Sequence, residues 1–300
     1  MRTIPMRFTK KFGITDPTPE FFDINIYGDT KKFVDPYCVQ QTPTPTGIAS
    51  QHCISIFIKD LLNAIQNQND KRSRYLCSSF NEPTGTRLGY SKIKKDGSGA
   101  GEYLASLFLE QLNNIRHLIQ MGIFNNLEEC SLLCDELKHD RISDITIDII
   151  KLPLIEFTQN QCHKYGIPIK RTKSKLKYFC ATSSTWKEDY FDLPHIDDTD
   201  EFLILIPRTF IPRVPTYNPM YFYTNTAQEH FKRKAIFNND SCVSKDRKGN
   251  IQVLSKDLKN SEQYKANKEN IRRSIIEDPQ LLIKFRNEIA YDIYLRNFKK

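Results

Sequence analysis

The sequence predicts a mainly helical α+β protein, and three observations lead to that class. Apolar residues recur with a helical period over much of the first half and of the C-terminal quarter. Extended, apolar or alternating segments are concentrated at about residues 175–207, which predicts one small antiparallel sheet there. The composition, 39% hydrophobic and 27% charged, is typical of an ordinary globular protein and excludes a disordered or fibrous one.

The first part of the chain is expected to become helical after an irregular start. Residues 29–37 predict a turn and a short extended segment that stops at Pro36, because the residue before a proline is disfavoured in a helix. Apolar residues between 50 and 70 share one helical face, which predicts a buried amphipathic helix. Residues 82–99 are rich in Gly, Pro, Ser and Lys and predict a loop, after which a long helix is expected over 102–122.

The middle of the chain combines an ambiguous segment with a long helix. Residues 127–138 fit either a strand or a short helix. Residues 140–165 continue with helical spacing until Gly166 and Pro168, which are expected to end the helix. Because a proline lacks an N–H group and crowds the preceding turn, Pro153 is expected to kink this helix or to split it.

Beyond Gly166 the pattern changes to β and then returns to helix. Residues 175–181 and 185–193 predict the two strands of a hairpin, and 201–207 predicts a short, fully buried strand. From residue 228 onwards the apolar spacing is again helical, with a polar loop expected near 238–250.

The formal net charge of +8 is concentrated at one end of the chain. Residues 1–230 hold 27 basic and 27 acidic side chains, whereas residues 231–300 hold 17 basic and 9 acidic ones. We therefore expect a charge-balanced body, 1–230, with a basic helical region, 231–300, packed on it. Attraction to nucleic acid is expected through 231–300, and the alternative is a solvated, lysine-rich helical tail.

Several classes of protein and site are disfavoured. No apolar run approaches the roughly 18–20 residues of a membrane span, and the first residues lack the apolar core of a secretory signal, so no membrane contact and a cytoplasmic location are expected. The eight cysteines include no CxxC pair, which favours free thiols over zinc ligands. Nothing signals a nicotinamide, flavin or haem. The glycine-rich run 97–101 before a helix is either an anion site or a flexible loop.

The segment around Asp140 is the most specific candidate for chemistry. Asp140, Asp144 and Asp148 are four residues apart, so they share one helix face, although like charges at this spacing destabilise an isolated helix by roughly 0.2–0.5 kcal/mol. In a structural interpretation, Asp140 caps the helix, Asp144 favours its positive end and Asp148 is solvated. In a chemical interpretation, two of these three aspartates join Asp35 in holding Mg²⁺ or Mn²⁺, which takes carboxylate oxygens and activates water.

A second candidate follows the apolar residues 132–134. Asp135-Glu136-Leu137-Lys138 has an acidic residue, one spacer and a lysine, which is how metal-dependent nucleases of the restriction-endonuclease type place a metal ligand beside a stabilising ammonium at a strand end. Lys138 and Arg208 are candidates for stabilising phosphate charge. His139 is a candidate general base, with an ordinary surface histidine as the alternative.

Three segments resemble a pattern of poorly characterised bacterial proteins, some of them associated with antiphage defence genes. The segments are Thr30-Lys-Lys-Phe-Val-Asp35-Pro-Tyr, Asp140-Arg-Ile-Ser-Asp144 with Tyr165-Gly-Ile-Pro, and Leu203-Ile-Leu-Ile-Pro207-Arg208 with Pro215-Thr-Tyr-Asn-Pro219. The resemblance implies a bacterial cytoplasmic protein that acts with a partner such as an ATPase, in which the two aspartate-bearing segments belong to one site. The Glu136-Leu-Lys138 element is not part of that pattern.

These observations lead to two functional hypotheses. The first is a component of antiviral defence that acts as a metal-dependent nuclease, a hydrolase of DNA or RNA, with Asp35, Asp140 and Asp144 as metal ligands and with Lys138 or Arg208 beside the phosphate. The second is a non-catalytic subunit that binds nucleic acid or protein and partners an ATPase or another effector. In the second hypothesis region 231–300 binds, and the aspartates only stabilise a helix.

Overall fold

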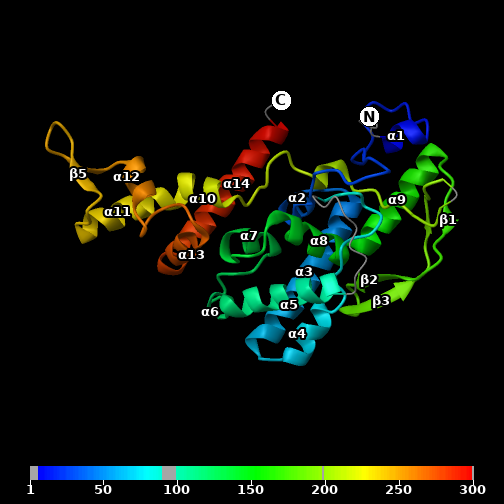
Figure 1. Cartoon of the computed structure of the whole chain (residues 1–300), viewed down its shortest axis with the longest axis horizontal. Helices are drawn as coiled ribbons and strands as arrows, with labels where there is room; N and C mark the ends of the chain where they lie inside the picture. Colours follow the sequence, from blue (N-terminus) through cyan, green and yellow to red (C-terminus); the bar gives the residue numbers. More distant parts are fainter. Residues whose placement is uncertain (1–5, 90–98, 198, 299–300) are drawn as a thin grey trace.

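The structure, a computed structural model, describes residues 6–89, 99–197 and 199–298. About 52% of the chain is helical, and the strands form small antiparallel pairs, which confirms the mainly helical α+β class. Figure 1 shows the N-terminal helices, α3, α8 and α9 in a larger part of the molecule, and α11 to α13 towards its other end. Searched over the described residues, the chain has no helix that is both long and apolar enough to cross a membrane.

The first part of the chain is built around one long helix. The helices here are α1 (Phe8–Lys11), α2 (Pro36–Gln40), α3 (Pro45–Gln66) and α4 (Asp70–Cys77). The start of α3 is fixed by Thr44, whose side chain accepts a hydrogen bond from the N–H of Gly47, and by Pro45 in the first turn. Its buried face includes Phe57 and Leu61, so the amphipathic helix expected between 50 and 70 is confirmed and begins one turn earlier.

The segment expected as one long helix over 102–122 is two helices. They are α5 (Gly99–Asn114) and α6 (Arg116–Gln120), separated at Ile115, whose N–H donates to the carbonyl of Leu112 at 3.2 Å. The ambiguous segment after them is helical: η1 (Leu127–Glu129) is a 3-10 turn and α7 (Cys130–Leu133) continues it. A capping box between Asn126 and Glu129 starts this turn. Residues 135–138 therefore come after a helix, and the strand end that the restriction-nuclease element needs is absent from this described segment.

The predicted split near Pro153 is confirmed. The two helices are α8 (His139–Ile149) and α9 (Lys151–Tyr165), and Ile150 between them has left the helical region at φ −95° and ψ 15°. The break lies four residues or fewer before Pro153, where the ring crowds the preceding turn and the missing N–H leaves a carbonyl unpaired. Gly166 ends α9 with a left-handed conformation, φ 64°, as glycine does readily.

The described strands form three antiparallel pairs. They are β1 (Lys170–Arg171) with β4 (Asp192–Leu193), β2 (Leu176–Cys180) with β3 (Thr185–Asp189), and β5 (Val243–Lys245) with β6 (Ile251–Val253). The β2–β3 pair is the predicted hairpin, and it places Lys177 opposite Glu188 and Phe179 opposite Trp186. The prediction of a polar loop near 238–250 is partly wrong, because β5 lies within this range and pairs with β6.

The prediction of a buried strand over 201–207 is also wrong, because no strand forms in this described segment. Residues 203–206 are fully buried. The segment pairs with other parts of the same chain only through isolated bridges at Phe202 and Pro207. Its backbone hydrogen bonds go to several separate partners. Ile204 N–H donates to the carbonyl of Gly85, Leu205 N–H to the hydroxyl of Thr158, and Leu203 N–H to the carbonyl of Pro194. A continuous apolar run indicates burial, and here separate loops and a helix satisfy the backbone instead of a neighbouring strand.

The last part of the chain is a set of helices with the β5–β6 hairpin at one end (Figure 1). Its elements are the 3-10 turn η2 (Arg208–Phe210), α10 (Pro219–Phe222), the π-helical turn η3 (Tyr223–Ala227), α11 (Gln228–Asn238), α12 (Ser255–Asn260), α13 (Lys268–Glu277) and α14 (Gln280–Phe298). Residue 230 lies inside α11, and α13 contacts α7. Arg286 forms an ion pair with the fully buried Glu129, which fastens α14 to the end of η1.

Candidate functional site

Asp35, one of the three predicted metal ligands, is occupied by structural hydrogen bonds. Its buried carboxylate caps α2 by accepting from the N–H of Tyr37 at 2.9 Å. It also accepts from the N–H and the hydroxyl of Thr216, each at 2.9 Å. Asp35 therefore joins α2 to the segment before α10, and its sequence neighbour Pro36 occupies the first helical position.

Asp140 and Asp144 lie one turn apart on α8. Lys138 is the cap of this helix, so the expectation that Asp140 caps it is wrong, although Asp140 lies in the first turn, where a carboxylate suits the positive helix end. Asp144 is half-buried, and burial, followed by the charges of Asp148 and Asp140, raises its pKa to about 8.

The third aspartate of the stack is not solvated as expected. Asp148 is fully buried, accepts from the N–H of Asn81 at 2.7 Å and forms an ion pair with Lys151 at 2.6 Å. Burial raises the pKa of Asp148, and the Lys151 ammonium opposes that rise. This aspartate joins α8 to the segment after α4, which explains why a third carboxylate is present on the helix.

The predicted ligands do not form a ready coordination group. Among the residues that the structure describes, no three His, Cys, Asp or Glu side chains are arranged so that they would hold a metal ion. Asp35 is used by Tyr37 and Thr216, while Asp140 is exposed. The described side chains thus do not fit Mg²⁺ or Mn²⁺ as they stand, and we derive no catalytic step through such an ion. Metal-dependent nuclease activity stays a prediction.

The other candidate catalytic groups lie in different surroundings. Lys138 is exposed at the start of α8, where its charge acts on Lys268, whereas the charge of the exposed Arg208 acts on Asp16. The ring of His139 stacks on Phe33 with centroids 5.6 Å apart, and burial lowers the pKa of His139 below its usual value. The structure thus gives no sign that Lys138 and Arg208 act on one phosphate.

The glycine-rich run lies only partly within the described residues. Gly97 and Ser98 lie outside them, and α5 begins at Gly99. Gly101 has a packing role, because a Cβ placed there would lie 2.3 Å from the carbonyl oxygen of Phe80. The close approach of α5 to Phe80 and Asn81, in the segment after α4, explains this glycine without an anion.

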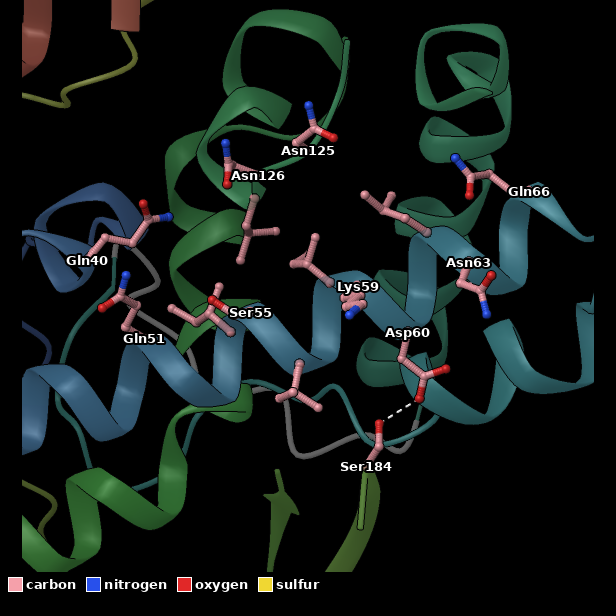
Figure 2. A pocket seen from close by; sticks show the side chains of 15 residues that line it. Gln40, Gln51, Ser55, Lys59, Asp60, Asn63, Gln66, Asn125, Asn126 and Ser184 are labelled. Carbon is pink, nitrogen blue, oxygen red and sulfur yellow. Dashed lines mark hydrogen bonds between the residues drawn. The ribbon is translucent and has the colours of Figure 1, made fainter. Parts of the chain in front are cut away.

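A groove of about 790 Å³ runs along α3. Figure 2 shows α3 on one side, with Ser55 and Lys59, and Asn125 and Asn126 on the facing side. Buried apolar residues of α3, among them Ile54 and Ile58, also line it. The groove is rich in carboxamide side chains. These are Gln40, Gln51, Asn63, Gln66, Asn125 and Asn126.

A second surface, which we call the basic tip, is formed by residues 228–260. It comprises α11, the β5–β6 hairpin and α12, which Figure 1 shows at the end of the molecule farthest from α1. Six of its basic side chains are exposed and make no ion pair with any carboxylate in the described chain. They are Arg233, Lys245, Arg247, Lys248, Lys256 and Lys259. Phe237, Ile251 and Leu254 are exposed on the same elements, at 90%, 58% and 38%.

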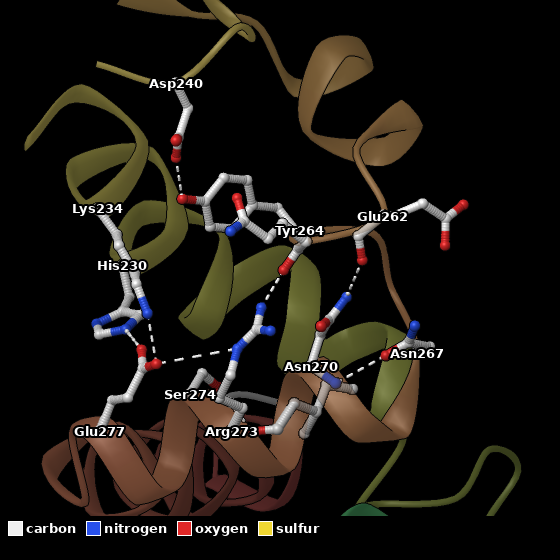
Figure 3. A network of polar contacts seen from close by, with 12 residues as sticks. His230, Lys234, Asp240, Glu262, Tyr264, Asn267, Asn270, Arg273, Ser274 and Glu277 are labelled. Carbon is white, nitrogen blue, oxygen red and sulfur yellow. Dashed lines mark hydrogen bonds and ion pairs between the residues drawn. The ribbon is translucent and has the colours of Figure 1, made fainter. Parts of the chain in front are cut away.

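Two of the acidic residues in the basic tip, Asp246 and Asp240, accept hydrogen bonds. Asp246 accepts hydrogen bonds from the N–H groups of Lys248 and Asn250 and closes the hairpin turn. Asp240 accepts from the hydroxyl of Tyr264 (Figure 3). Since these carboxylates are turned to local hydrogen bonds and are not ion-paired with the six cations, the positive charge of the tip faces solvent.

Apart from those six, most basic side chains of the C-terminal quarter have partners. Figure 3 shows Lys234, His230 and Arg273 converging on Glu277, where α11 meets α13. Burial raises the pKa of Glu277, but hydrogen bonds from Lys234 and His230 outweigh it and hold the pKa below its usual value. Lys268 donates to the carbonyl of Cys134. The charge excess of the region is thus split between internal contacts and the exposed tip.

One family model, described as Domain of unknown function (DUF8370), matches residues 13–218 of the chain. The chain belongs to the DUF8370 family. Comparison with curated proteins and with solved structures finds no match to it. The DUF8370 region contains the groove along α3 and the predicted ligands Asp35, Asp140 and Asp144, whereas the basic tip lies beyond it.

Sequence reasoning missed the groove and located the basic tip only as part of a longer region. A signal for the groove is present in the sequence, since Gln51, Ser55, Asn63 and Gln66 place uncharged polar groups on the outer face of α3. Asn125 and Asn126 on the facing side are far from them in sequence, and only the fold of this DUF8370 chain brings them there.

Proposed function

We propose that this DUF8370 protein binds nucleic acid through the basic tip, as the non-catalytic hypothesis holds. The observation that carries the proposal is the exposed group of six basic side chains without ion-pair partners in the described chain. Between Arg233 and Lys259 the chain has seven basic and three acidic residues, so the local field is positive. Cations that have no carboxylate partner are available to neutralise phosphates and to release the counterions bound to them.

The exposed apolar side chains support a polynucleotide over a small anion. Phe237 is 90% exposed and lies on α11 near the hairpin, where its ring has a face free for stacking on a base. Ile251 and Leu254 provide further apolar area beside Lys256. A surface that alternates cations with apolar groups matches the phosphates and the bases of a nucleic acid together.

The β5–β6 hairpin also presents basic side chains of the tip on a narrow ribbon. β5 and β6 are three residues each, and the turn between them contains Arg247 and Lys248. A two-stranded ribbon of this kind fits a groove of duplex DNA. Nuclease action, a partner ATPase and a role in antiphage defence concern steps after binding, and they stay predictions.

The test is to remove charge from the hairpin and measure the salt dependence of binding. We expect Lys245→Ser, Arg247→Ser and Lys248→Ser combined to weaken binding of labelled duplex DNA, single-stranded DNA and RNA in fluorescence anisotropy titrations. If six phosphates are neutralised, the slope of log K against log salt is about −5, and the triple variant reduces it to about −3. A matched control removes three exposed charges from the body through Lys10→Ser, Lys71→Ser and Lys177→Ser.

Three outcomes are contrary to the proposal. The first is that the triple variant and wild type have the same binding strength and the same salt slope. The second is that the control variant weakens binding as much as the hairpin variant does. The third is that the tip binds vesicles of anionic phospholipid in a sedimentation assay and binds none of the three nucleic acids.

A further inference from the structure

The groove along α3 has the length and shape of a site for a chain molecule. Its α3 face runs from Gln51 to Gln66 through Ser55, Lys59 and Asn63, and these positions recur every three or four residues. At about 1.5 Å of rise per helical residue, that face is about 22 Å long. An extended polypeptide rises about 3.3 Å per residue, so roughly seven residues fit along it.

In three of the carboxamides, the NH₂ group is hydrogen-bonded to other described residues and the oxygen is not. The Gln40 side chain donates to Glu128 at 3.0 Å, that of Gln66 donates to the carbonyl of Ile119 at 3.0 Å, and that of Asn125 donates to the carbonyl of Gly122 at 2.7 Å. In each case the NH₂ group is used and the carboxamide oxygen accepts no hydrogen bond from the described residues. The groove thus presents three acceptors held in place and in need of donors.

Along α3 the polar groups are unconstrained. Gln51 and Ser55 are exposed and make no side-chain hydrogen bond within the described residues, and the NH₂ group of Asn63 has no partner there. Ligand carbonyl groups would accept hydrogen bonds from these donors. Between the polar groups lie the apolar side chains of Ile54, Ile58 and neighbouring residues.

Charge and ring content of the lining distinguish between ligand classes. The charged lining residues are Lys59 and Asp60. Asp60 accepts from the hydroxyl of Ser184 (Figure 2) and forms an ion pair with Arg72. A phosphate-bearing ligand is bound by clusters of cations, which this lining of described residues lacks. It also has no aromatic residue, although bases are recognised by stacking on aromatic rings.

We propose that this groove binds an extended, uncharged polypeptide segment of a partner protein. Its main-chain N–H groups donate to the fixed oxygens of Gln40, Gln66 and Asn125, and its carbonyl groups accept from the carboxamides of α3. Aliphatic side chains of the segment pack on Ile56 and Leu62, which also line the groove and are only half-buried. The main-chain groups supply the affinity in this mode, and the apolar contacts supply the specificity. The proposal is independent of nucleic-acid binding, since it uses other residues.

The experiment selects heptapeptides from a random library displayed on phage, against the full-length protein. Ser55→Trp fills the groove with an indole, and His52→Trp places the same ring on an exposed position of α3 outside it. Circular dichroism and the melting temperature confirm that both variants are folded. Selected peptides are expected to be uncharged and rich in aliphatic residues. Their affinity, measured by calorimetry, should fall at least tenfold on Ser55→Trp and stay unchanged on His52→Trp.

The proposal is overturned if no peptide is enriched on wild type over a parallel selection on Ser55→Trp. It is equally overturned if selected peptides bind Ser55→Trp as well as wild type, or if all of them are highly charged. A loss of DNA or RNA binding on Ser55→Trp, equal to that caused by the hairpin triple variant, would assign the groove to nucleic acid instead. Failure of the hairpin variant to change nucleic-acid binding has no bearing on these outcomes.

Discussion

Asp144 gives the sharpest test of how α8 uses its carboxylates. Its pKa is raised from the usual 3.8 to about 8 by burial and then by the charges of Asp148 and Asp140. In the unfolded chain the same carboxyl group ionises near its usual pKa. As pH rises above that pKa, ionisation stabilises the unfolded state, whereas the folded state keeps the group protonated up to about pH 8. Stability contributed by the protonated group is therefore full below pH 4 and is lost progressively up to about pH 8.

The magnitude comes from the two pKa values. At pH 7 the difference between the pH and the unperturbed pKa of 3.8 corresponds to about 4 kcal/mol, at 1.36 kcal/mol per pH unit. Because Asp144 is only half-buried, water reduces this value, and about 2 kcal/mol is a reasonable expectation. Asp144→Asn removes the ionisation and should raise the free energy of unfolding by that amount at pH 7, with little change near pH 4.

Urea denaturation followed by circular dichroism at several pH values measures this effect. Asp140→Asn, one turn away and exposed, is the control, and it should change the free energy of unfolding by less than about 0.5 kcal/mol. Equal stability of Asp144→Asn and wild type at pH 7 would refute the reasoning. The same proteins test the metal hypothesis: if Asp144 is a ligand, Mg²⁺ or Mn²⁺ raises the melting temperature of wild type and not of Asp144→Asn.

Two further predictions concern packing. Arg286→Met should lower the free energy of unfolding by about 3 kcal/mol, because it leaves the fully buried Glu129 without its cation. The control Lys284→Met removes only an exposed pair with Glu288 and should lower the free energy of unfolding by about 0.5 kcal/mol or less. Similar losses in the two denaturation curves would be contrary to this account. Gly101→Ala should cost about 1–3 kcal/mol, since the added Cβ meets the carbonyl of Phe80; a melting temperature equal to that of wild type would show that α5 shifts freely.

The elements that could be predicted from the sequence are those whose signal is local. Proline at 153 and glycine at 166 set the ends of α8 and α9 through their own backbone chemistry, and the alternation around Phe179 and Trp186 sets the β2–β3 hairpin. Of the run 201–207, residues 203–207 are correctly predicted to lie in the interior, whereas Glu201 is exposed. Its partners could not be predicted, because an apolar run does not tell whether a strand or a set of loops will meet its backbone.

The candidate site shows the same limit. Helical spacing correctly places Asp140 and Asp144 on neighbouring turns of α8. Nothing in the spacing shows that Asp35 accepts from Thr216, or that Asp148 pairs with Lys151 inside the protein. The use of each carboxylate depends on segments distant in sequence. For the basic tip, the excess of charge is visible in the sequence, but which cations stay unpaired depends on how α13 and α14 pack.

The buried segment 203–206 has a consequence for how the chain folds. Phe8, Phe21 and Ile24 near the N-terminus share a core cluster with Leu203 and Leu205, and the N–H of Phe22 donates to the carbonyl of Ile206. During synthesis, the first part of the chain must wait for these residues to leave the ribosome before its apolar side chains are covered. Contacts of such wide sequence separation form slowly. Residues 8–24 are therefore a stretch that a holding chaperone can bind while the chain up to residue 206 is being made.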